Sequence, residues 1–394
     1  MDAGTQKVVR ILLHFTKHLV PCLLTLGTLL VSCQSPNMPE STPEAPESNT
    51  GTPPVSEPGL TLNLTPTPQL ETLSGTGDFG YREGAGNEAQ FYHPSSIVRQ
   101  DDGSLIVLDR LNYMLRLVDP MTGETSPYWG SGQRGNRDGN EAEGLMNDPF
   151  SLLAHSSGDL LITDSKNHTI RRLDSTGYLS TLAGTGSEGF KDGLGTTAAF
   201  NWPADIVEDA ESNLYVSDRF NHAIRKITPQ GEVSTLAGNG EMGYDDAKGT
   251  QARFNEPMGL ALGPDNVLYV ADSQNHVIRK IILENGEVTT YAGSGFEGSR
   301  EDVRTRAEFR VPTSLAFDPR GNLLVLDRFN HRLRRIANET VTTLMGTGFP
   351  ERLDGATHES EGFSYPVDMT LDPEGNIYIV DHGNHAIRKI TYFK

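Results

Sequence analysis

Asp218-Arg-Phe-Asn-His-Ala-Ile-Arg-Lys-Ile227 is the clearest copy of a motif in which an Asp is followed three residues later by an Asn. The motif starts six times along the chain, at Asp109, Asp164, Asp218, Asp272, Asp327 and Asp381. Successive copies are 54 or 55 residues apart. A constant period of this length indicates a protein built from repeated supersecondary units.

Two further columns of residues share this period. One is a Gly-x-Gly turn that begins at Gly75, Gly130, Gly184, Gly238, Gly293 and Gly346. The other is a proline, at Pro94, Pro149, Pro203, Pro257, Pro312 and Pro366. Between these markers each unit holds four short apolar or alternating segments, separated by Gly, Asn and Asp, and none has a helical period. Six units of four antiparallel strands predict an all-β fold, a six-bladed β-propeller with one unit per blade.

The repeated segments resemble a known family. Asn221-His-Ala-Ile-Arg-Lys-Ile227, Asn275-His-Val-Ile-Arg-Lys-Ile281 and Asn384-His-Ala-Ile-Arg-Lys-Ile390 are similar to NHL repeats, and the resemblance extends over about residues 70–394. The first copy departs from it, because Tyr113 stands where the other copies have His. The resemblance implies a six-bladed propeller. It implies no single function, since some propellers with similar repeats are lactonases or lyases.

The order of segments along the chain predicts how the ring closes. The last copy stops at Lys394, just after its third strand, Ala386 to Tyr392, and lacks the outer segment that ends every other copy. An unassigned segment of that type, Leu70-Glu-Thr-Leu-Ser-Gly75, precedes the first copy. We therefore expect this N-terminal strand to complete the sixth blade, which would remove an open sheet edge.

The N-terminus has the features of a targeting segment. Basic residues precede the apolar run from Leu19 to Val31, which is too short to span a bilayer and of the right length for a signal-peptide core. The run ends in Leu30-Val31-Ser32-Cys33, which resembles the lipobox of bacterial lipoproteins. We expect residues 1–32 to be a lipoprotein signal peptide and Cys33 to carry the lipid. The alternative is an ordinary secretory signal with an incidental Cys.

Residues 33–59 are expected to form a disordered tether after the lipidated Cys33. They are rich in Pro, Ser and Thr and contain almost nothing that a core could bury. Residues 60–394 are then the propeller. This organisation predicts a protein anchored in the bacterial cell envelope, in the outer membrane if the cell is Gram-negative, with the propeller in the periplasm or on the cell surface.

Charge and composition exclude several classes of function. The chain has 33 Lys and Arg against 52 Asp and Glu, so its formal net charge of −19 argues against nucleic-acid binding. Both Cys lie within the first 33 residues, which excludes a disulfide scaffold or a Cys nucleophile elsewhere. No Gly-x-Ser-x-Gly, His-Glu-x-x-His or Walker motif is present. We expect a monomeric binding or scaffold module for a protein, peptide or glycan. The alternative is a metal-dependent hydrolase or lyase.

Columns that repeat in all blades are expected to build the fold. The Asp-x-x-Asn residues are predicted to cap their own turns. The repeated Arg column should pair with nearby acids: Arg116, Arg171, Arg225, Arg279, Arg334 and Arg388. An acidic loop column is also assigned to turn chemistry: Glu83, Asp138, Asp192, Asp246, Glu301 and Asp354. Five matches to the dinucleotide fingerprint lack the helix that it requires, so we interpret their glycines as turn residues.

Columns that vary where the blades converge are free to form a site. The residues just before the repeated Pro are His93, Asp148, Trp202, Glu256, Val311 and Tyr365. Two residues after it stand Ser96, Ser151, Asp205, Gly259, Ser314 and Asp368. Both columns should lie at the mouth of the central channel, where Asp205 and Asp368 would face each other. The predicted ligand-binding residues are His93, Asp148, Trp202, Asp205, Glu256, Tyr365 and Asp368.

Four of these residues carry carboxylates, whose oxygens are hard ligands. Asp148, Asp205, Glu256 and Asp368 could hold Ca²⁺ or another divalent cation. Alternatively, clustered carboxylates with raised pKa values could perform acid–base chemistry, or the mouth could simply be solvated.

A second variable column forms the expected rim. Arg110, Arg219 and Arg328 occupy the first turn position of blades one, three and five, and each precedes Leu or Phe. Together they could bind an anionic or aromatic ligand or a protein partner. The alternative is that they pair with the acidic loop column.

Overall fold

The computed structural model describes residues 68–354 and 362–391, all within one compact unit, Asn63–Lys394. The predicted signal peptide (1–32), Cys33 and the tether (33–59) lie outside the described residues and stay predictions. Within the described residues, no helix has the length and apolar character needed to cross a membrane.

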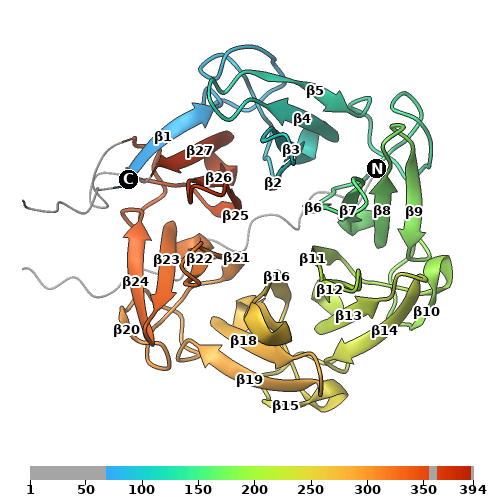
Figure 1. The fold of residues 1–394 in the computed structure, drawn as a ribbon, viewed down its shortest axis with the longest axis vertical. Helices are drawn as coiled ribbons and strands as arrows, with labels where there is room; N and C mark the ends of the chain where they lie inside the picture. The colour runs from blue at the N-terminus through green and yellow to red at the C-terminus, as the bar shows by residue number, and fades with distance from the viewer. Residues whose placement is uncertain (1–67, 355–361, 392–394) are drawn as a thin grey trace, which may run out of the picture. The chain divides into compact units, whose positions relative to one another are not determined.

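Six antiparallel sheets are arranged around an axis as the blades of a propeller (Figure 1). Blade 1 comprises β2 (Ser96–Arg99), β3 (Leu105–Asp109), β4 (Met114–Val118) and β5 (Thr125–Trp129). Blade 2 comprises β6 (Ser151–Ala154), β7 (Leu160–Asp164), β8 (Thr169–Leu173) and β9 (Leu179–Ala183). Blade 3 comprises β11 (Pro203–Glu208), β12 (Leu214–Asp218), β13 (Ala223–Ile227) and β14 (Glu232–Ala237). Blade 4 comprises β16 (Pro257–Leu262), β17 (Val267–Asp272), β18 (Val277–Ile282) and β19 (Glu287–Ala292). Blade 5 comprises β21 (Pro312–Phe317), β22 (Leu323–Asp327), β23 (Arg332–Ala337) and β24 (Thr340–Met345). Blade 6 comprises β25 (Pro366–Leu371), β26 (Ile377–Asp381) and β27 (Ala386–Thr391). The first strand of each blade lies nearest the axis, which confirms the all-β six-bladed prediction.

The sixth blade is completed by the N-terminal strand β1 (Gln69–Ser74). It pairs antiparallel with β27, with Gln69 opposite Thr391 and Thr72 opposite Arg388. The sheet order is β1-β27-β26-β25, and the two ends of the described chain lie side by side in Figure 1. The predicted closure is confirmed.

The number of strands per blade differs in part from the prediction. Blades 3, 4 and 5 each have a fifth strand of two residues on the outer edge: β10 (Gly193–Leu194), β15 (Ala247–Lys248) and β20 (Asp302–Val303). In each case the loop that leads into the blade passes its outermost strand and hydrogen-bonds to it. Blades 1 and 2 make one isolated bridge at the same place, Gly84 with Thr125 and Gly139 with Leu179. The extra strands therefore cover edges that would otherwise be open.

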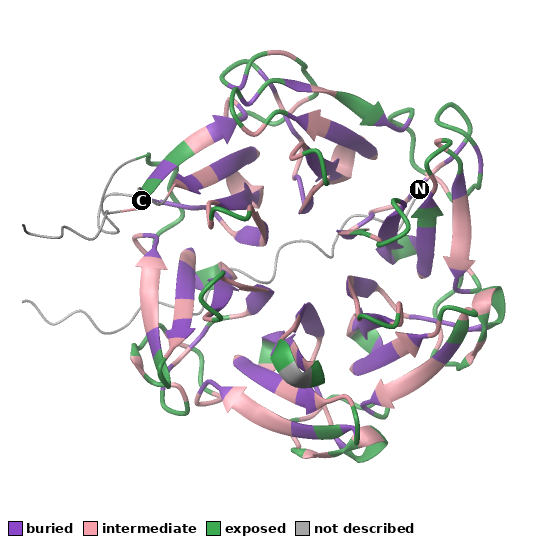
Figure 2. Cartoon of the chain, in the orientation of Figure 1, coloured by how far each residue is buried: buried purple, intermediate pink, exposed green. Residues whose placement is uncertain are grey.

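The hydrophobic core lies between neighbouring blades. Each of six clusters of buried residues joins two adjacent blades; one, for example, combines Leu161 and Ile170 of blade 2 with Ile206 and Val216 of blade 3. Figure 2 shows these buried residues on the inner strands of every blade. The blades stabilise one another, so the ring needs all six.

Each repeated Asp is fully buried and bonds to three different segments. In blade 3, Asp218 Oδ1 accepts the backbone N–H of Asn201 at 2.7 Å, and Oδ2 accepts the Asn221 amide at 2.8 Å and Arg225 Nη1 at 2.7 Å. Arg225 also donates to the carbonyls of Ala199 and Lys191, each at 3.0 Å. The same three bonds to the carboxylate recur in every blade.

The prediction that the Asp caps its own turn is wrong. The turns are short 3-10 segments without a side-chain cap: η1 (Arg110–Asn112), η2 (Ser165–Asn167), η4 (Arg219–Asn221), η7 (Ser273–Asn275), η8 (Arg328–Asn330) and η9 (His382–Asn384). The carboxylate points instead into the blade, where it joins the turn, the third strand and the loop 17 residues earlier. The structural role and the pairing with Arg are confirmed.

The acidic loop column contacts the same arginines at the blade surface. Asp138, Asp192, Asp246 and Asp354 form ion pairs of 2.6 to 2.7 Å with Arg171, Arg225, Arg279 and Arg388. In the other two blades, Glu83 accepts the Tyr81 hydroxyl and Glu301 accepts the N–H of Thr343. Five of the six acids therefore contribute to blade construction through partners on the third or fourth strand, and only Glu83 bonds within its own loop as the turn prediction had it.

Candidate functional site

The residue before each repeated Pro adopts a left-handed backbone conformation. The φ values of His93, Asp148, Trp202, Glu256, Val311 and Tyr365 lie between 50° and 57°. Such angles are uncommon for residues other than Gly and persist only where the surroundings hold them. These residues open the innermost strands, so the ring end on which they lie is called the entry face here. It also holds the turns η1, η2, η4, η7, η8 and η9.

The repeated histidines hold five of these six positions. Nδ1 of each His accepts the N–H of the pre-proline residue of the next blade at 3.1 to 3.3 Å: His168 with Trp202, His222 with Glu256, His276 with Val311, His331 with Tyr365 and His385 with His93. Burial lowers the pKa of all five, so the ring is neutral and its Nδ1 can accept. We call this contact the histidine junction. Tyr113 takes the place of His between blades 1 and 2.

Two of the three rim arginines form ion pairs along the entry face. Arg110 Nε lies 2.5 Å from Asp148 Oδ1, and Arg219 Nη2 lies 2.7 Å from Glu256 Oε2. Each Arg thus pairs with the pre-proline carboxylate of the next blade, and the alternative pairing with the acidic loop column is wrong. That column is occupied by the buried arginines.

The third rim arginine has no such partner. The pre-proline residue that follows Arg328 is Tyr365, and the side chain of Arg328 forms no ion pair or hydrogen bond within the described residues. Its Nε is buried, and its Cζ lies 5.6 Å from the centre of the Phe329 ring. Burial, together with the charges of Arg110 and Arg219, lowers the pKa of Arg328 to about 10.

Asp205 and Asp368 lie deeper, where they connect blades. Asp368 accepts the Ser96 hydroxyl at 2.6 Å, the Ile97 N–H at 3.0 Å and the Ser314 hydroxyl at 3.0 Å, which joins blades 1, 6 and 5. Burial raises its pKa to about 7, and the charge of Asp205 contributes to that rise. The two carboxylates come from innermost strands three blades apart, β11 and β25, and that they face each other stays a prediction.

Asp205 makes the equivalent connection on the other side of the ring. It accepts the Ser151 hydroxyl at 2.6 Å and the Leu260 N–H at 2.8 Å, which joins blade 3 to blades 2 and 4. Burial raises its pKa as well. Ser and backbone N–H donors thus occupy both carboxylates.

The four predicted metal ligands occupy two different environments. Asp148 and Glu256 are paired with arginines, whereas Asp205 and Asp368 are enclosed by hydroxyl and N–H donors. Among residues 68–354 and 362–391, no three His, Cys, Asp or Glu side chains are grouped so as to hold a metal ion. The divalent-cation site stays a prediction, and the contacts assign these carboxylates to other partners.

Aromatic and apolar side chains surround the arginines on the entry face. Trp202 lies 5.6 Å from Phe220, and Tyr365 lies 5.4 Å from Phe329, between ring centres. Farther out, the loops that lead to the innermost strands carry four exposed apolar side chains: Phe79 at 66%, Met242 at 68%, Phe296 at 74% and Phe349 at 67%. Sequence reasoning missed these four. Their common signal is a position three or four residues after the repeated Gly.

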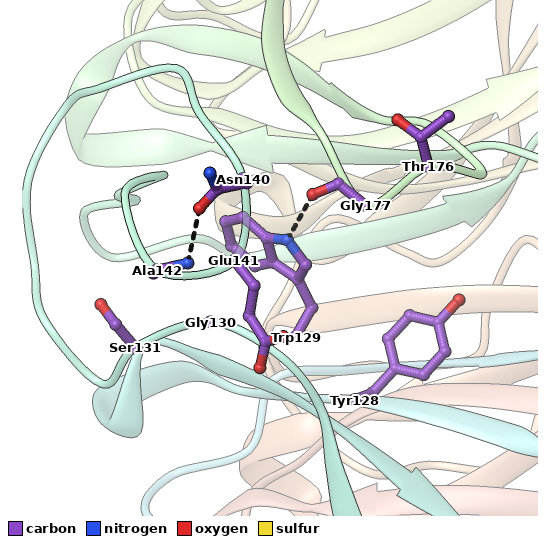
Figure 3. A pocket seen from close by; sticks show the side chains of 9 residues that line it. All are labelled: Tyr128, Trp129, Gly130, Ser131, Asn140, Glu141, Ala142, Thr176 and Gly177. Atoms are coloured by element: carbon purple, nitrogen blue, oxygen red, sulfur yellow. Dashed lines mark hydrogen bonds between the residues drawn. The ribbon is translucent and has the colours of Figure 1, made fainter.

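A groove of about 560 Å³ lies at the outside of blades 1 and 2 (Figure 3). Tyr128 and Trp129 of β5, Asn140 and Glu141 of the following loop, and Thr176 of blade 2 line it. Trp129 is nearly buried and donates its Nε1–H to the Gly177 carbonyl at 3.0 Å. This indole therefore connects two blades, and none of the predicted site residues lines the groove.

Comparisons with known proteins agree with the repeat and the architecture. The NHL repeat model matches residues 363–390. The chain is 28% identical over 283 residues to Protein SUPPRESSOR OF QUENCHING 1, chloroplastic, of Arabidopsis thaliana, covering 67% of this chain and 27% of that protein. It is 26% identical over 330 residues to NHL repeat-containing protein 2 of Bos taurus, covering 72% of this chain and 45% of that protein. The chain thus spans between about a quarter and a half of these relatives.

Solved structures share the fold at low sequence identity. An auxiliary nutrient binding protein from Bacteroides thetaiotaomicron superposes with a TM-score of 0.65 at 15% identity, over 84% of this chain and 77% of that one. A streptogramin B lyase superposes with a TM-score of 0.52 at 14% identity, over 83% of this chain and 98% of that one. At these identities the likeness extends to the fold alone. The chain is a six-bladed β-propeller that carries an NHL repeat in residues 363–390.

Proposed function

We propose that this chain is an exported, membrane-anchored binding module whose propeller binds a protein, peptide or glycan on the entry face. The observation that carries the proposal is the exposed apolar surface of that face. Phe79, Met242, Phe296 and Phe349 are each about two-thirds exposed or more, and apolar side chains that gather on one face of a protein mark interaction sites. Aromatic side chains exposed on rigid loops are common in protein and glycan recognition.

The position of these side chains supports a shared use. They lie in loops between the outer strand of one blade and the innermost strand of the next, so they surround the rim arginines. Phe220 and Phe329 lie nearer the axis and are a little over one-third exposed. A ligand that covered this face would bury apolar area at the edge and meet guanidinium groups near the axis. One structural relative is described as a nutrient binding protein, which is compatible with a binding role.

Peptide and glycan arrays probed with the purified full-length chain test the binding proposal. The double variant Phe79→Ser, Phe296→Ser should weaken binding about ten-fold or more, since each change removes a large apolar contact. The control is Met121→Ser, because Met121 is 81% exposed in a turn at the opposite ends of the strands. Equal binding by both variants, or no binding on either array, would refute the proposed use of the entry face.

The anchoring part of the proposal rests on the lipobox-like Leu30-Val31-Ser32-Cys33 and on the tether after it. Cys33→Ala should move the protein from the membrane fraction to the soluble fraction of the producing cell. A variant that remains in the membrane fraction with an unchanged processed mass would show that Cys33 carries no lipid.

A further inference from the structure

The entry face has a pattern that repeats every two blades. Arginine opens the turn after the second strand in blades 1, 3 and 5, as Arg110, Arg219 and Arg328. In blades 2, 4 and 6 that position donates to the carbonyl of the next repeated proline. Ser165 bonds to Pro203 at 2.6 Å, Ser273 to Pro312 at 2.6 Å and His382 to Pro94 at 2.9 Å. The ring therefore consists of three sectors, blades 1–2, 3–4 and 5–6.

The sector of blades 5–6 differs from the other two at both variable positions. In the first two sectors a carboxylate neutralises the arginine, Asp148 for Arg110 and Glu256 for Arg219. In the third, Tyr365 stands where the carboxylate would be, and His382 replaces Ser. Arg328 consequently has a guanidinium group without a counter-ion in the described residues.

The guanidinium group of Arg328 is charged and partly buried. Its pKa of about 10 leaves it protonated at neutral pH. Its Nε is buried without an acceptor, whereas the residue as a whole is only partly buried. A partly buried charge without a partner costs free energy, and a bound anion would remove that cost.

The neighbours of Arg328 add surface but no negative charge. Phe329 and Tyr365 meet edge to face beside it. The rings of His382 and His93 lie 4.5 Å apart, and His93 Nδ1 is a second buried nitrogen without a partner. Burial and the charge of Arg328 lower the pKa of His382 to about 3, so this ring is neutral at pH 7. The cluster thus combines one fixed positive charge with flat aromatic walls.

We propose that the sector of blades 5–6 binds the carboxylate of an external ligand, with Arg328 as its counter-ion. The other two sectors support the choice of a carboxylate, because Asp148 and Glu256 supply that group to their arginines from within the chain. Arginine binds carboxylates through two parallel N–H donors, and the partly exposed guanidinium of Arg328, which has no acceptor within the described residues, can offer them. The inference rests on the proposed function, since it assigns the ligand of the entry face an acidic group.

Calorimetric titration of the full-length chain with sodium benzoate, acetate and inorganic phosphate tests the proposal, with sodium chloride at equal ionic strength as the blank. The carboxylates should bind saturably, and benzoate more tightly than acetate because of the aromatic walls. Arg328→Met should weaken carboxylate binding about ten-fold or more. Arg320→Met is the matched control, since Arg320 is exposed in a turn at the opposite ends of the strands.

A second variant keeps the test decisive should Arg328→Met fail to fold. Tyr365→Glu reproduces the arrangement of Glu256, which has a similar φ, and should abolish benzoate binding while the melting temperature rises. Met121→Glu introduces the same charge on the other face and should leave binding unchanged. Unaltered binding by Arg328→Met or Tyr365→Glu, or binding of phosphate in preference to both carboxylates, would overturn the proposal. Array binding that is normal in Arg328→Met would refute this inference alone, not the wider function.

Discussion

Two sets of aspartates with raised pKa values are held in different ways in this propeller. The repeated Asp of each blade is paired with a fully buried arginine, as Asp218 is with Arg225 at 2.7 Å. Asp205 and Asp368 near the axis have only hydroxyl and N–H donors. Burial raises the pKa in both sets, to about 6 for Asp218 and about 7 for Asp368. The repeated aspartates therefore have a cationic partner within their own blade, whereas Asp205 and Asp368 have none.

This difference explains which residues repeat. A blade that buries a carboxylate together with its arginine buries no net charge, so the same Asp–Arg pair can be used in all six blades. Asp205 and Asp368 each connect three blades and occur three blades apart, which keeps two uncompensated charges as far apart as the ring allows. Their interaction still raises the pKa of Asp368. Repetition marks construction of the blade and the histidine junctions, and variation marks the aspartates that connect three blades and the candidate ligand site.

The largest expected effect comes from breaking a compensated pair. Arg225→Met leaves Asp218 buried without its cation and also removes donors to the carbonyls of Ala199 and Lys191. The free energy of unfolding should fall by about 3–5 kcal/mol, as for other buried pairs that lose one member. Chemical denaturation followed by circular dichroism measures it.

The matched control uses the other partner of the same arginine. Asp192 is half exposed, so Asp192→Asn should cost no more than about 1 kcal/mol. A cost below about 1 kcal/mol for Arg225→Met as well would contradict the distinction between buried and surface partners.

A loss of stability of intermediate size is expected when Asp368, which has no cationic partner, is replaced, and this loss should depend on pH. A folded-state pKa of about 7 against 3.8 in the unfolded chain means that Asp368 favours folding most below pH 3.8. That contribution is lost as pH rises through 7. Asp368→Asn removes this dependence along with some acceptor capacity. The variant should therefore cost about 1–3 kcal/mol at pH 5 and less at pH 8. Denaturation at both pH values checks this, and equal costs would contradict the raised pKa.

Much of the fold follows from the sequence, because the features concerned are local or periodic. The period gives the number of blades, and the unassigned segment at Leu70 gives the closure. The partners of Asp218 could not be derived in that way. Its carboxylate bonds to Asn201, 17 residues earlier, and only the folded blade brings the two together.

The candidate site was predicted only in part for a similar reason. The pre-proline column opens the innermost strands, which lie nearest the axis. The pairing of Arg219 with Glu256, however, crosses a blade boundary over 37 residues. The absence of a carboxylate opposite Arg328 is visible in the sequence only once this blade-to-blade register is known. The exposure of Phe296 also depends on how its loop is placed above the blades.

The smallest expected effect concerns the histidine junctions, which connect the repeated set to the variable one. His222 Nδ1 accepts the Glu256 N–H at 3.1 Å, so His222→Asn should cost about 1 kcal/mol at pH 8. Burial lowers the pKa of His222 although Glu256 opposes this. As pH falls below 6.5, the unfolded chain binds a proton that the folded chain does not, and wild type loses stability relative to the variant. The difference in free energy of unfolding between wild type and His222→Asn should therefore shrink from pH 8 to pH 5.

Tyr113→Asn is the matched control, because that position has the same left-handed backbone without an imidazole, and its effect on stability should not change with pH. A His222→Asn difference that stays constant across this range would show that the junction does not require a neutral ring.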